Sequence, residues 1–320
     1  MSEAILKVED LTRLFRVGGF RSRGLLHAID EVSFEVAPAE IVALVGESGS
    51  GKSTIARVLA GLYPPSSGSF VFEGKSMGRH ENRQVRGDMP MVFQDPFGSI
   101  NPVLRVGHAL NRSLKLHRPE LSRAQRQAEA VSLVERVGLT PGEEVLRRYP
   151  HELSGGQRQR LGFAQALASK PSLILADEPV SMLDVSIRIG LLNVMRSLRD
   201  NDGVSILYIT HDLASARYVA DRMIVLYAGR IVEQGLTEEV IGSPQHPYTR
   251  LLMSSAPDPH LAPAEFESDD LGEPPKVINP GPGCRFAPRC PLVMEQCHHG
   301  TPGMVTLSPT HGADCYAVRT

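Results

Sequence analysis

A glycine-rich segment, GESGSGKST from Gly46 to Thr54, has the residue types and the order of a loop that binds phosphate. Its glycines allow backbone N–H groups to turn inward around phosphate oxygens, Lys52 can neutralise β- and γ-phosphate charge, and Ser53 can offer its hydroxyl to Mg²⁺. The apolar run IVALV before the loop and TIARVLAGL after it supply the strand and the helix that this motif requires. A flexible turn with a solvated lysine is the alternative. The sequence therefore predicts an ATP site that includes Gly46, Glu47, Ser48, Gly49, Ser50, Gly51, Lys52, Ser53 and Thr54.

A pair of acids ends a second apolar run, LILADEP. Asp177 lies where a strand would end and suits a ligand of Mg²⁺ or of its water, whereas Glu178 suits the polarising of an attacking water. Two adjacent acids after a strand are usually only solvated. Because a phosphate-binding loop precedes them in the same chain, we expect Asp177 and Glu178 to belong to the ATP site.

The segment LSGGQRQRL indicates a second anion site. Ser154 can cap the helix that follows, and Gly155 and Gly156 expose backbone donors at its N-terminus, next to Gln157. A capped surface helix is the alternative. One nucleotide does not need two phosphate cradles from one chain, but two copies that face each other head to tail do. The segment therefore predicts that each copy closes over the ATP of the other.

Together these motifs, in this order, resemble the nucleotide-binding subunits of ABC transporters over about residues 6–235. The resemblance implies that Gln94 in MVFQDP touches Mg²⁺ or the water and faces the membrane subunit, and that His211 in YITHD contacts the γ-phosphate. It also implies that Phe15 stacks on adenine and that Asp184 in SMLD lies in the loop that packs across the dimer. Three residues depart from the usual pattern, namely Phe15 for tyrosine, Met182 for alanine and Gln165 for arginine.

A narrower resemblance to the ATP-binding subunits of oligopeptide and dipeptide importers rests on NPVLRVG, DEPVSMLDVSIR, SPQHPYTRLLMSSAPD and the cysteine pattern at the end of the chain. It implies ATP-driven uptake of peptides with a second, identical or homologous, ATP-binding subunit, two transmembrane permease subunits and an extracytoplasmic solute-binding protein. Importers of nickel, glutathione and other small solutes share these cues. The rival class is a soluble ABC-type ATPase that acts on DNA or ribosomes, and such proteins tend to carry coiled coils, paired cassettes or basic surfaces.

Four cysteines, Cys284, Cys290, Cys297 and Cys315, are confined to the C-terminal part of the chain. A reducing compartment disfavours disulfides. Zinc is an alternative, with His298, His299 and His311 as further ligands, although tight C-x2-C knuckles are missing. Unligated thiols are another alternative. Four thiolates fit the count of a [4Fe–4S] cluster, which some members of the resembling family hold there. We expect the cluster to order the tail as a module separate from the ATP site.

The elements that must position these groups follow from the apolar pattern. Strands are predicted at VSFEV, IVALV, SLILADEP, SILYITHD and RMIVLYAGRIVEQG, and a helical block interrupts them at about residues 95–170. Within the block, RAQRQAEAVSLVERVGL has helical spacing and Gly138 is the expected stop. The pattern predicts an α/β core interrupted by helices. With the family resemblance, the fold class expected is a P-loop ATPase core (residues 1–242) with an antiparallel β subdomain and this α-helical subdomain, followed by a proline- and cysteine-rich extension (residues 243–320).

Bulk composition narrows the function. The formal net charge is −2, with 34 Lys and Arg against 36 Asp and Glu, which gives no reason to expect a nucleic-acid surface. No apolar run approaches the roughly 20 residues that span a bilayer, and the N-terminal residues lack a signal pattern. These features predict a cytosolic chain, and the resemblance to importer subunits implies that it is peripheral on the cytoplasmic face of the inner membrane. Of the 24 prolines, 13 follow residue 243. A region with so little apolar material needs a cross-link, such as a bound metal, or packing against the rest of the protein to become ordered.

Overall fold

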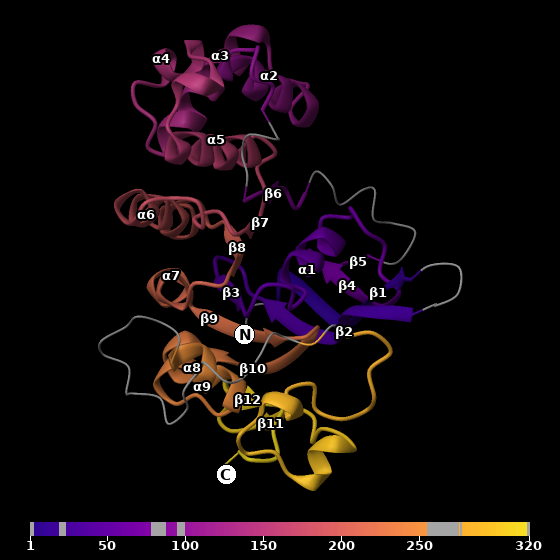
Figure 1. Cartoon of the computed structure of the whole chain (residues 1–320). Coiled ribbons are helices and arrows are strands. Elements are labelled where there is room, and N and C mark those ends of the chain that lie inside the picture. The colour runs from indigo at the N-terminus through magenta and orange to yellow at the C-terminus, as the bar shows by residue number, and fades with distance from the viewer. Residues whose placement is uncertain are drawn as a thin grey trace.

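The computed structural model describes residues 3–18, 24–77, 88–94, 100–254, 275 and 277–318. Within these residues the chain forms two β-sheets, a block of helices and a C-terminal tail (Figure 1). Residues 277–318 form the C-terminal tail. Residues 255–274 and 276 of the predicted proline-rich extension lie outside the described residues.

The central sheet contains eight strands in the described part of the chain, in the order β11-β12-β10-β9-β3-β8-β7-β6. Strands β6, β7, β8, β3 and β9 run parallel to one another, whereas β10, β12 and β11 are antiparallel. The bounds are β3 Ile41–Val45, β6 Met91–Val92, β7 Leu173–Asp177, β8 Ser205–Thr210, β9 Arg222–Tyr227, β10 Arg230–Leu236, β11 Val305–Thr306 and β12 Gly312–Ala313.

A second sheet is antiparallel, with the order β2-β1-β4-β5. Its strands are β1 Leu6–Val17, β2 Gly24–Val36, β4 Ser67–Phe72 and β5 Lys75–Met77. Both faces of β3 are buried, as its uninterrupted apolar sequence predicts. Val42 and Leu44 face a core shared with this antiparallel sheet, whereas Ile41, Ala43 and Val45 face a second core shared with the helical block. The strand that leads into the phosphate loop is thus fixed from both sides.

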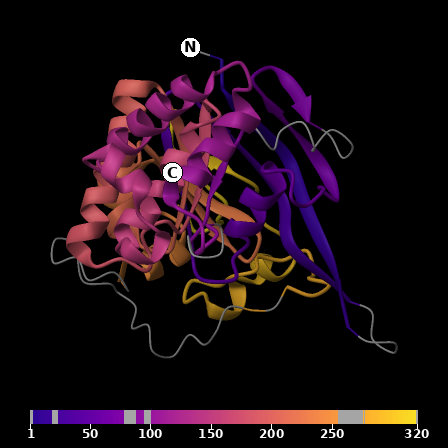
Figure 2. The ribbon, with the colours of Figure 1, turned by 90° about the horizontal axis from the view of Figure 1, so that it is seen from above.

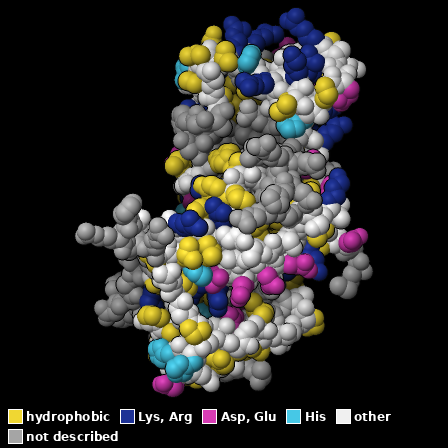
Figure 3. Space-filling model, turned by 90° about the vertical axis from the view of Figure 1, so that its right-hand side faces the viewer, with side chains coloured by type: hydrophobic (Ala, Val, Ile, Leu, Met, Phe, Trp, Pro, Cys, Tyr) yellow, Lys and Arg dark blue, Asp and Glu magenta, His cyan; other side chains and the backbone are white. Residues whose placement is uncertain are grey.

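The helical block consists of α2 Val106–His117, α3 Arg123–Arg136, α4 Gly142–Arg147 and α5 Gly155–Leu167. The predicted helix in this region is confirmed as α3, and Gly138 follows its end with a φ of 75°, in the left-handed region. Figure 2 shows the helices of the block and the indigo antiparallel strands on opposite sides of the molecule. Lys and Arg side chains gather on the end formed by the block (Figure 3). The remaining helices are α1 Lys52–Leu59, α6 Val185–Asp202, α7 Leu213–Val219, α8 Thr237–Gly242 and α9 Pro247–Ser254.

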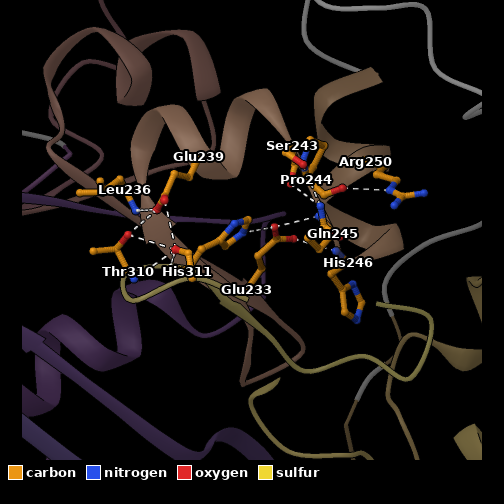
Figure 4. A network of polar contacts seen from close by, with 11 residues as sticks. Glu233, Leu236, Glu239, Ser243, Pro244, Gln245, His246, Arg250, Thr310 and His311 are labelled. Carbon is orange, nitrogen blue, oxygen red and sulfur yellow. Dashed lines mark hydrogen bonds and ion pairs between the residues drawn. The ribbon is translucent and has the colours of Figure 1, made fainter. Parts of the chain in front are cut away.

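The C-terminal tail packs on the central sheet through strand pairing and a buried polar network. Residues of β12 pair with Glu233 and Gln234 of β10, which extends the sheet. Glu233 is fully buried, and its carboxylate accepts hydrogen bonds from the backbone amides of Gln245 (2.9 Å) and His246 (2.8 Å). The ring of His311, from the tail, lies 2.8 Å from the same carboxylate (Figure 4). One buried acid therefore joins β10, the segment before α9 and the tail.

Candidate ATP site at the carboxyl edge of the central sheet

The parallel register brings the predicted catalytic segments to one edge of the central sheet. Val45, the last residue of β3, is level with Thr210 of β8, and Asp177 of β7 is level with Ile209. On the other side of β7, Val92 of β6 is level with Ala176. The segments that leave these strands therefore emerge side by side. They carry the phosphate loop (residues 46–54), Glu178, His211 and Gln94, in the place where open α/β sheets bind ligands.

The phosphate loop is shaped by glycines at which no other residue would fit. Gly46 has φ 152°, and a Cβ there would lie 2.1 Å from the carbonyl oxygen of Leu226. Gly51 has φ 108°, and a Cβ there would lie 2.2 Å from the carbonyl oxygen of Ala28. The loop is thus pressed against β2 and the end of β9. Lys52 and Ser53 then begin α1, so the loop leads directly into a helix N-terminus.

Lys52 is buried, with 4% of its surface exposed, and its ammonium is held against the loop itself. Nζ donates to the carbonyl oxygens of Gly46 (2.7 Å) and Glu47 (2.8 Å) and lies 3.3 Å from the hydroxyl of Ser50. Burial lowers the pKa of Lys52, and the negative charges of Glu178, Asp177 and Glu47 oppose this shift. Phosphate oxygens can replace these carbonyl acceptors with little movement of the side chain.

Ser53 and Asp177 form the oxygen pair expected at a magnesium site. The Ser53 hydroxyl donates to Oδ1 of Asp177 over 2.7 Å, across the gap between α1 and the end of β7. Burial raises the pKa of Asp177, and the hydrogen bond from Ser53 works against that shift. A divalent cation coordinated here would favour the ionised carboxylate, and both oxygens are the ligand type that Mg²⁺ prefers.

Glu178 and His211, two residues predicted to act in catalysis, lie in contact. Oε2 of Glu178 is 3.2 Å from Nδ1 of His211, and the amide of Glu178 donates to the carbonyl of Ile209 at 2.9 Å. Glu178 adopts φ 46°, a left-handed conformation that costs energy for a non-glycine residue and recurs at functional sites. The turn after β7 thus holds this carboxylate in a strained position beside His211.

Gln94 and Phe15 lie near the edges of the site. Gln94 is exposed two residues after β6. Phe15, in β1, is partly buried, and the guanidinium of Arg13 lies 4.5 Å from the centre of its ring. The ring of Tyr63 packs edge-on against Phe15, with 5.6 Å between the ring centres. The sequence did not predict Arg13 or Tyr63 here, because neither belongs to a motif.

The segment LSGGQRQRL (residues 153–161), called the signature segment below, is separated from the phosphate loop of its own chain. Ser154 caps α5 by accepting from the amide of Gln157 at 3.2 Å, while the Gln157 side chain accepts from the amide of Ser154 at 3.0 Å. In Figure 1, α5 lies in the helical block, whereas α1 lies beside the antiparallel sheet. A Cβ at Gly156 would lie 2.2 Å from Ile187 Cγ2, which packs this glycine against α6.

Asp184 precedes α6 and is exposed. Near it Met182, Val185 and Ile189 also expose their apolar side chains. Behind this surface, Arg188 of α6 forms an ion pair with Asp212 at 2.8 Å, and Asp212 caps α7 directly after His211. Arg188 could not be predicted here, because a single arginine in a helix gives no signal of this contact.

The four cysteines line one pocket, together with apolar side chains that include Phe286, Leu292 and Met294. All four are free thiols. Burial raises the pKa of Cys284 and Cys315 and raises that of Cys290 to about 11. Among the residues that the structure describes, no group of His, Cys, Asp and Glu is arranged to hold a metal ion. The expected spare ligand His311 is engaged by Glu233 instead.

The tail also contacts the phosphate loop, which corrects the expectation of two separate modules. Arg289, directly before Cys290, donates from Nη1 and Nη2 to the two carboxylate oxygens of Glu47, at 2.9 and 3.0 Å. Tyr248 of α9 accepts from the amide of Glu47 through its hydroxyl at 2.8 Å. Sequence reasoning could not find these pairs, since Glu47 and Arg289 are 242 positions apart.

The comparisons with known proteins agree with this geometry. Residues 29–181 match the family model described as "ABC transporter", and residues 232–297 match that described as "Oligopeptide/dipeptide transporter, C-terminal region". A probable peptide ABC transporter ATP-binding protein of Sinorhizobium fredii is 43% identical over 99% of this chain and 90% of its own length. The oligopeptide transport ATP-binding protein OppF of Haemophilus influenzae is 38% identical over 99% of this chain and 98% of its own.

Solved structures show the same fold. A dimeric, post-hydrolysis structure of the ATP-binding cassette MJ0796 with ADP and Pi aligns with a TM-score of 0.63 and 27% identity, over 72% of this chain and 98% of that one. CbiO1 of Clostridium perfringens aligns with a TM-score of 0.65 and 26% identity, over 76% of this chain and 92% of that one. The relatives are peptide transport subunits, as predicted, and none of these names points to the rival class that acts on DNA or ribosomes. The chain therefore belongs to the family of ATP-binding subunits of oligopeptide/dipeptide ABC transporters.

Proposed function

We propose that the residues at the carboxyl edge of the central sheet form one half of an ATP site that a second ATP-binding subunit completes, and that closure of the pair drives a peptide permease. The observation that carries the proposal is the shared register of β3, β8, β7 and β6, which gathers the phosphate loop, His211, Glu178 and Gln94 at one edge. The signature segment lies apart from that edge, so its donors are available to another subunit.

Each residue then has a task that its position suits. Lys52 and the backbone of the loop bind the β- and γ-phosphates, and the helix N-terminus of α1 adds favourable dipole charge. Glu178 accepts the proton of an attacking water, while His211 holds Glu178 and contacts the γ-phosphate. The ring of Phe15, with Arg13 and Tyr63 beside it, provides the surface for adenine.

Ser53 and Asp177 would hold Mg²⁺, with Gln94 approaching from β6. The cation would neutralise charge on the β- and γ-phosphates during transfer to water. The residues fit this role because Ser53 and Asp177 already lie 2.7 Å apart and both present oxygen.

The second subunit would contact the surface around Asp184. Met182, Val185 and Ile189 are exposed there, close to the buried side of the signature helix. Paired with another copy of the fold, this surface would be covered, and Ser154, Gly155, Gly156 and Gln157 would reach the partner's γ-phosphate. The solved relative MJ0796 is dimeric. Methionine in place of alanine at position 182 adds apolar area to the contact.

The permease would dock beside Gln94. Phe93 is exposed next to Gln94, and a pocket lined by Phe93, Gln159, Gly162 and Gln165 lies between β6 and α5. Gln159 donates to the carbonyl of Phe93 at 2.9 Å, so movement of β6 is transmitted to the helical block. The docked subunit would work on the cytoplasmic face of the inner membrane, with two permease subunits and a solute-binding protein. No helix in the described residues is long and apolar enough to cross a membrane.

The division of labour follows the predicted domains. Residues 1–242 would bind and hydrolyse ATP, with residues 95–170 as the helical subdomain that faces the permease. Residues 243–320 would form the extension that carries the cysteines. This division is supported by the motifs, which lie in the first part, and by the cysteine pocket, which lies in the second.

The cysteine pocket would hold a [4Fe–4S] cluster. What supports a shared group is that all four thiols line one pocket. The amide of Ala317 donates to Cys315 Sγ at 3.4 Å, and the amides of Phe286 and Ala287 act in the same way on Cys284. Hydrogen bonds of this kind stabilise ligated thiolates. The cluster would supply four metal–sulfur bonds that staple the tail.

Two measurements test these proposals. The rate of ATP hydrolysis per subunit should fall on dilution of the purified chain, because each site borrows donors from its partner. A rate that stays constant into the monomeric range, as judged by gel filtration, would contradict the shared site. Anaerobically purified protein should contain iron and sulfide in equal amounts. If metal analysis finds one zinc and no iron, the pocket holds zinc and not a cluster. If it finds neither metal, the thiols are unligated.

A further inference from the structure

Glu47, within the phosphate loop, is held by the C-terminal extension from two directions. Its carboxylate receives both terminal nitrogens of Arg289, and its amide donates to the hydroxyl of Tyr248. Tyr248 is fully buried in the core that the helical block shares with the central sheet. One residue of the ATP site is therefore bound through its side chain and through its backbone by segments that follow residue 242.

Arg289 is itself fixed in place. Its guanidinium lies 5.8 Å from the ring centres of both Tyr227 and Phe286, and Nη1 is 3.3 Å from the Tyr227 hydroxyl. Phe286 and Tyr248 also pack on each other, with ring centres 5.5 Å apart. Because the arginine is held by aromatic rings and by a two-pronged carboxylate contact, it loses little freedom on binding Glu47.

The contact reaches the group that binds phosphate. The carbonyl of Glu47 accepts from Nζ of Lys52 at 2.8 Å, so the position of residue 47 sets one of the acceptors of the lysine. A second connection runs through the turn after β9. Arg285 bonds to the carbonyl of Ala228, and the amide of the next residue, Gly229, donates to the carbonyl of Ser50 at 2.8 Å.

From these contacts we infer that Arg289 is a positioning residue for the phosphate loop, through which the C-terminal tail sets the affinity of the subunit for ATP. The inference rests on the proposed nucleotide site and adds a determinant that lies outside its motifs. Arg289 acts through Glu47 and touches no reacting atom, so it should alter binding more than the chemical step. Cys290 directly follows Arg289 in the tail, so a change at this cysteine should also alter the position of the phosphate loop.

The test is a double-mutant cycle on the full chain, with a fluorescent ATP analogue to measure Kd and steady-state hydrolysis to measure KM and kcat. Arg289→Ala removes charge-assisted hydrogen bonds and should weaken binding about tenfold. Glu47→Gln should weaken it about fivefold, and the double variant should be no weaker than Arg289→Ala, because both remove the same contact. KM should rise while kcat stays within about twofold.

Three further variants sharpen the result. Arg289→Lys keeps the charge but not the fork, so it should recover part of the affinity. Arg250→Ala is the matched control, since this arginine of α9 bonds to the carbonyl of Pro244 and to nothing in the loop, and binding should not change. Cys290→Ser should weaken binding in the same direction as Arg289→Ala. Thermal unfolding of each variant reports whether the fold is retained.

The outcomes separate the inference from the proposed function. If Lys52→Ala abolishes binding while Arg289→Ala leaves Kd unchanged, the nucleotide site stands and the positioning role is wrong. If the effects of Arg289→Ala and Glu47→Gln multiply to about fiftyfold, Arg289 acts independently of Glu47 and the inference also fails. If Lys52→Ala binds the analogue as the native chain does, both the site and the inference fall.

Discussion

Replacing His311 with alanine tests whether the buried acid at the base of the tail secures it to the central sheet. The Glu233 carboxylate has no exposed surface and accepts three contacts, of which the His311 ring, itself only 7% exposed, is the one from the tail (Figure 4). The amides of Gln245 and His246 still donate to the carboxylate after the substitution, so Glu233 keeps two hydrogen bonds. We expect a loss of about 2 kcal/mol, in the range of a hydrogen bond to a charged group.

The chain contains no tryptophan, so unfolding is best followed by circular dichroism in urea or on heating. A loss of this size should lower the midpoint of thermal unfolding by about 3 °C for a chain of 320 residues. Hydrogen exchange should locate the effect, because the amide of Asp314 donates to the carbonyl of Val232 at 2.9 Å and should lose protection first.

His299→Ala provides the matched control. Its ring is 75% exposed and lies 3.5 Å from the exposed carboxylate of Glu295, a pair that should contribute less than about 1 kcal/mol. If His311→Ala shifts the midpoint no further than His299→Ala, the buried acid does not secure the tail. The same conclusion would follow if the Asp314 amide kept its protection.

Four other substitutions probe the candidate ATP site. Lys52→Ala should abolish ATP binding and transport, because the phosphates lose their fixed counter-charge, and normal turnover would refute the role of the loop. Glu178→Gln should lower hydrolysis by about 10²–10⁴-fold while ATP still binds and drives dimers on gel filtration, since the amide keeps the shape but cannot take the proton. Gly51→Ala should lower the unfolding temperature more than Gly49→Ala, because both carry a positive φ but only the first places a Cβ against the carbonyl of Ala28. Equal effects of the two glycine substitutions would contradict the packing described for the loop.

The sequence predicted the parts of the fold that depend on neighbouring residues. IVALV is buried on both faces because its pattern is apolar throughout, and Ser154 caps α5 because serine and glutamine stand three positions apart. Gly138 follows the end of α3 because glycine readily adopts the left-handed conformation found there. The predicted catalytic segments were assigned to one site by their motifs, and the structure brings them together because the carboxyl ends of parallel strands share one edge.

The contacts between the tail and the ATP site could not be predicted. Arg289 stands alone among the cysteines, so neither periodicity nor spacing indicates its partner. Its partner Glu47 belongs to the phosphate-loop motif, in which the glycines, Lys52 and Ser53 already account for the binding of phosphate. His311 was assigned as a spare metal ligand on proximity in sequence, whereas the fold directs it to Glu233 of β10. Pairings of this length are decided by how the tail crosses the sheet, which local patterns do not encode.

The pairing of β12 with β10 also has a consequence for the state of the free chain. β10 would be the outer strand of the central sheet without the tail, and an uncovered outer strand offers unpaired N–H and C=O groups to other molecules. β12 and β11 occupy part of that position with two residues each. A chain that ended at α8 would expose this row of groups in every copy, so the tail protects the free chain against edge-to-edge aggregation.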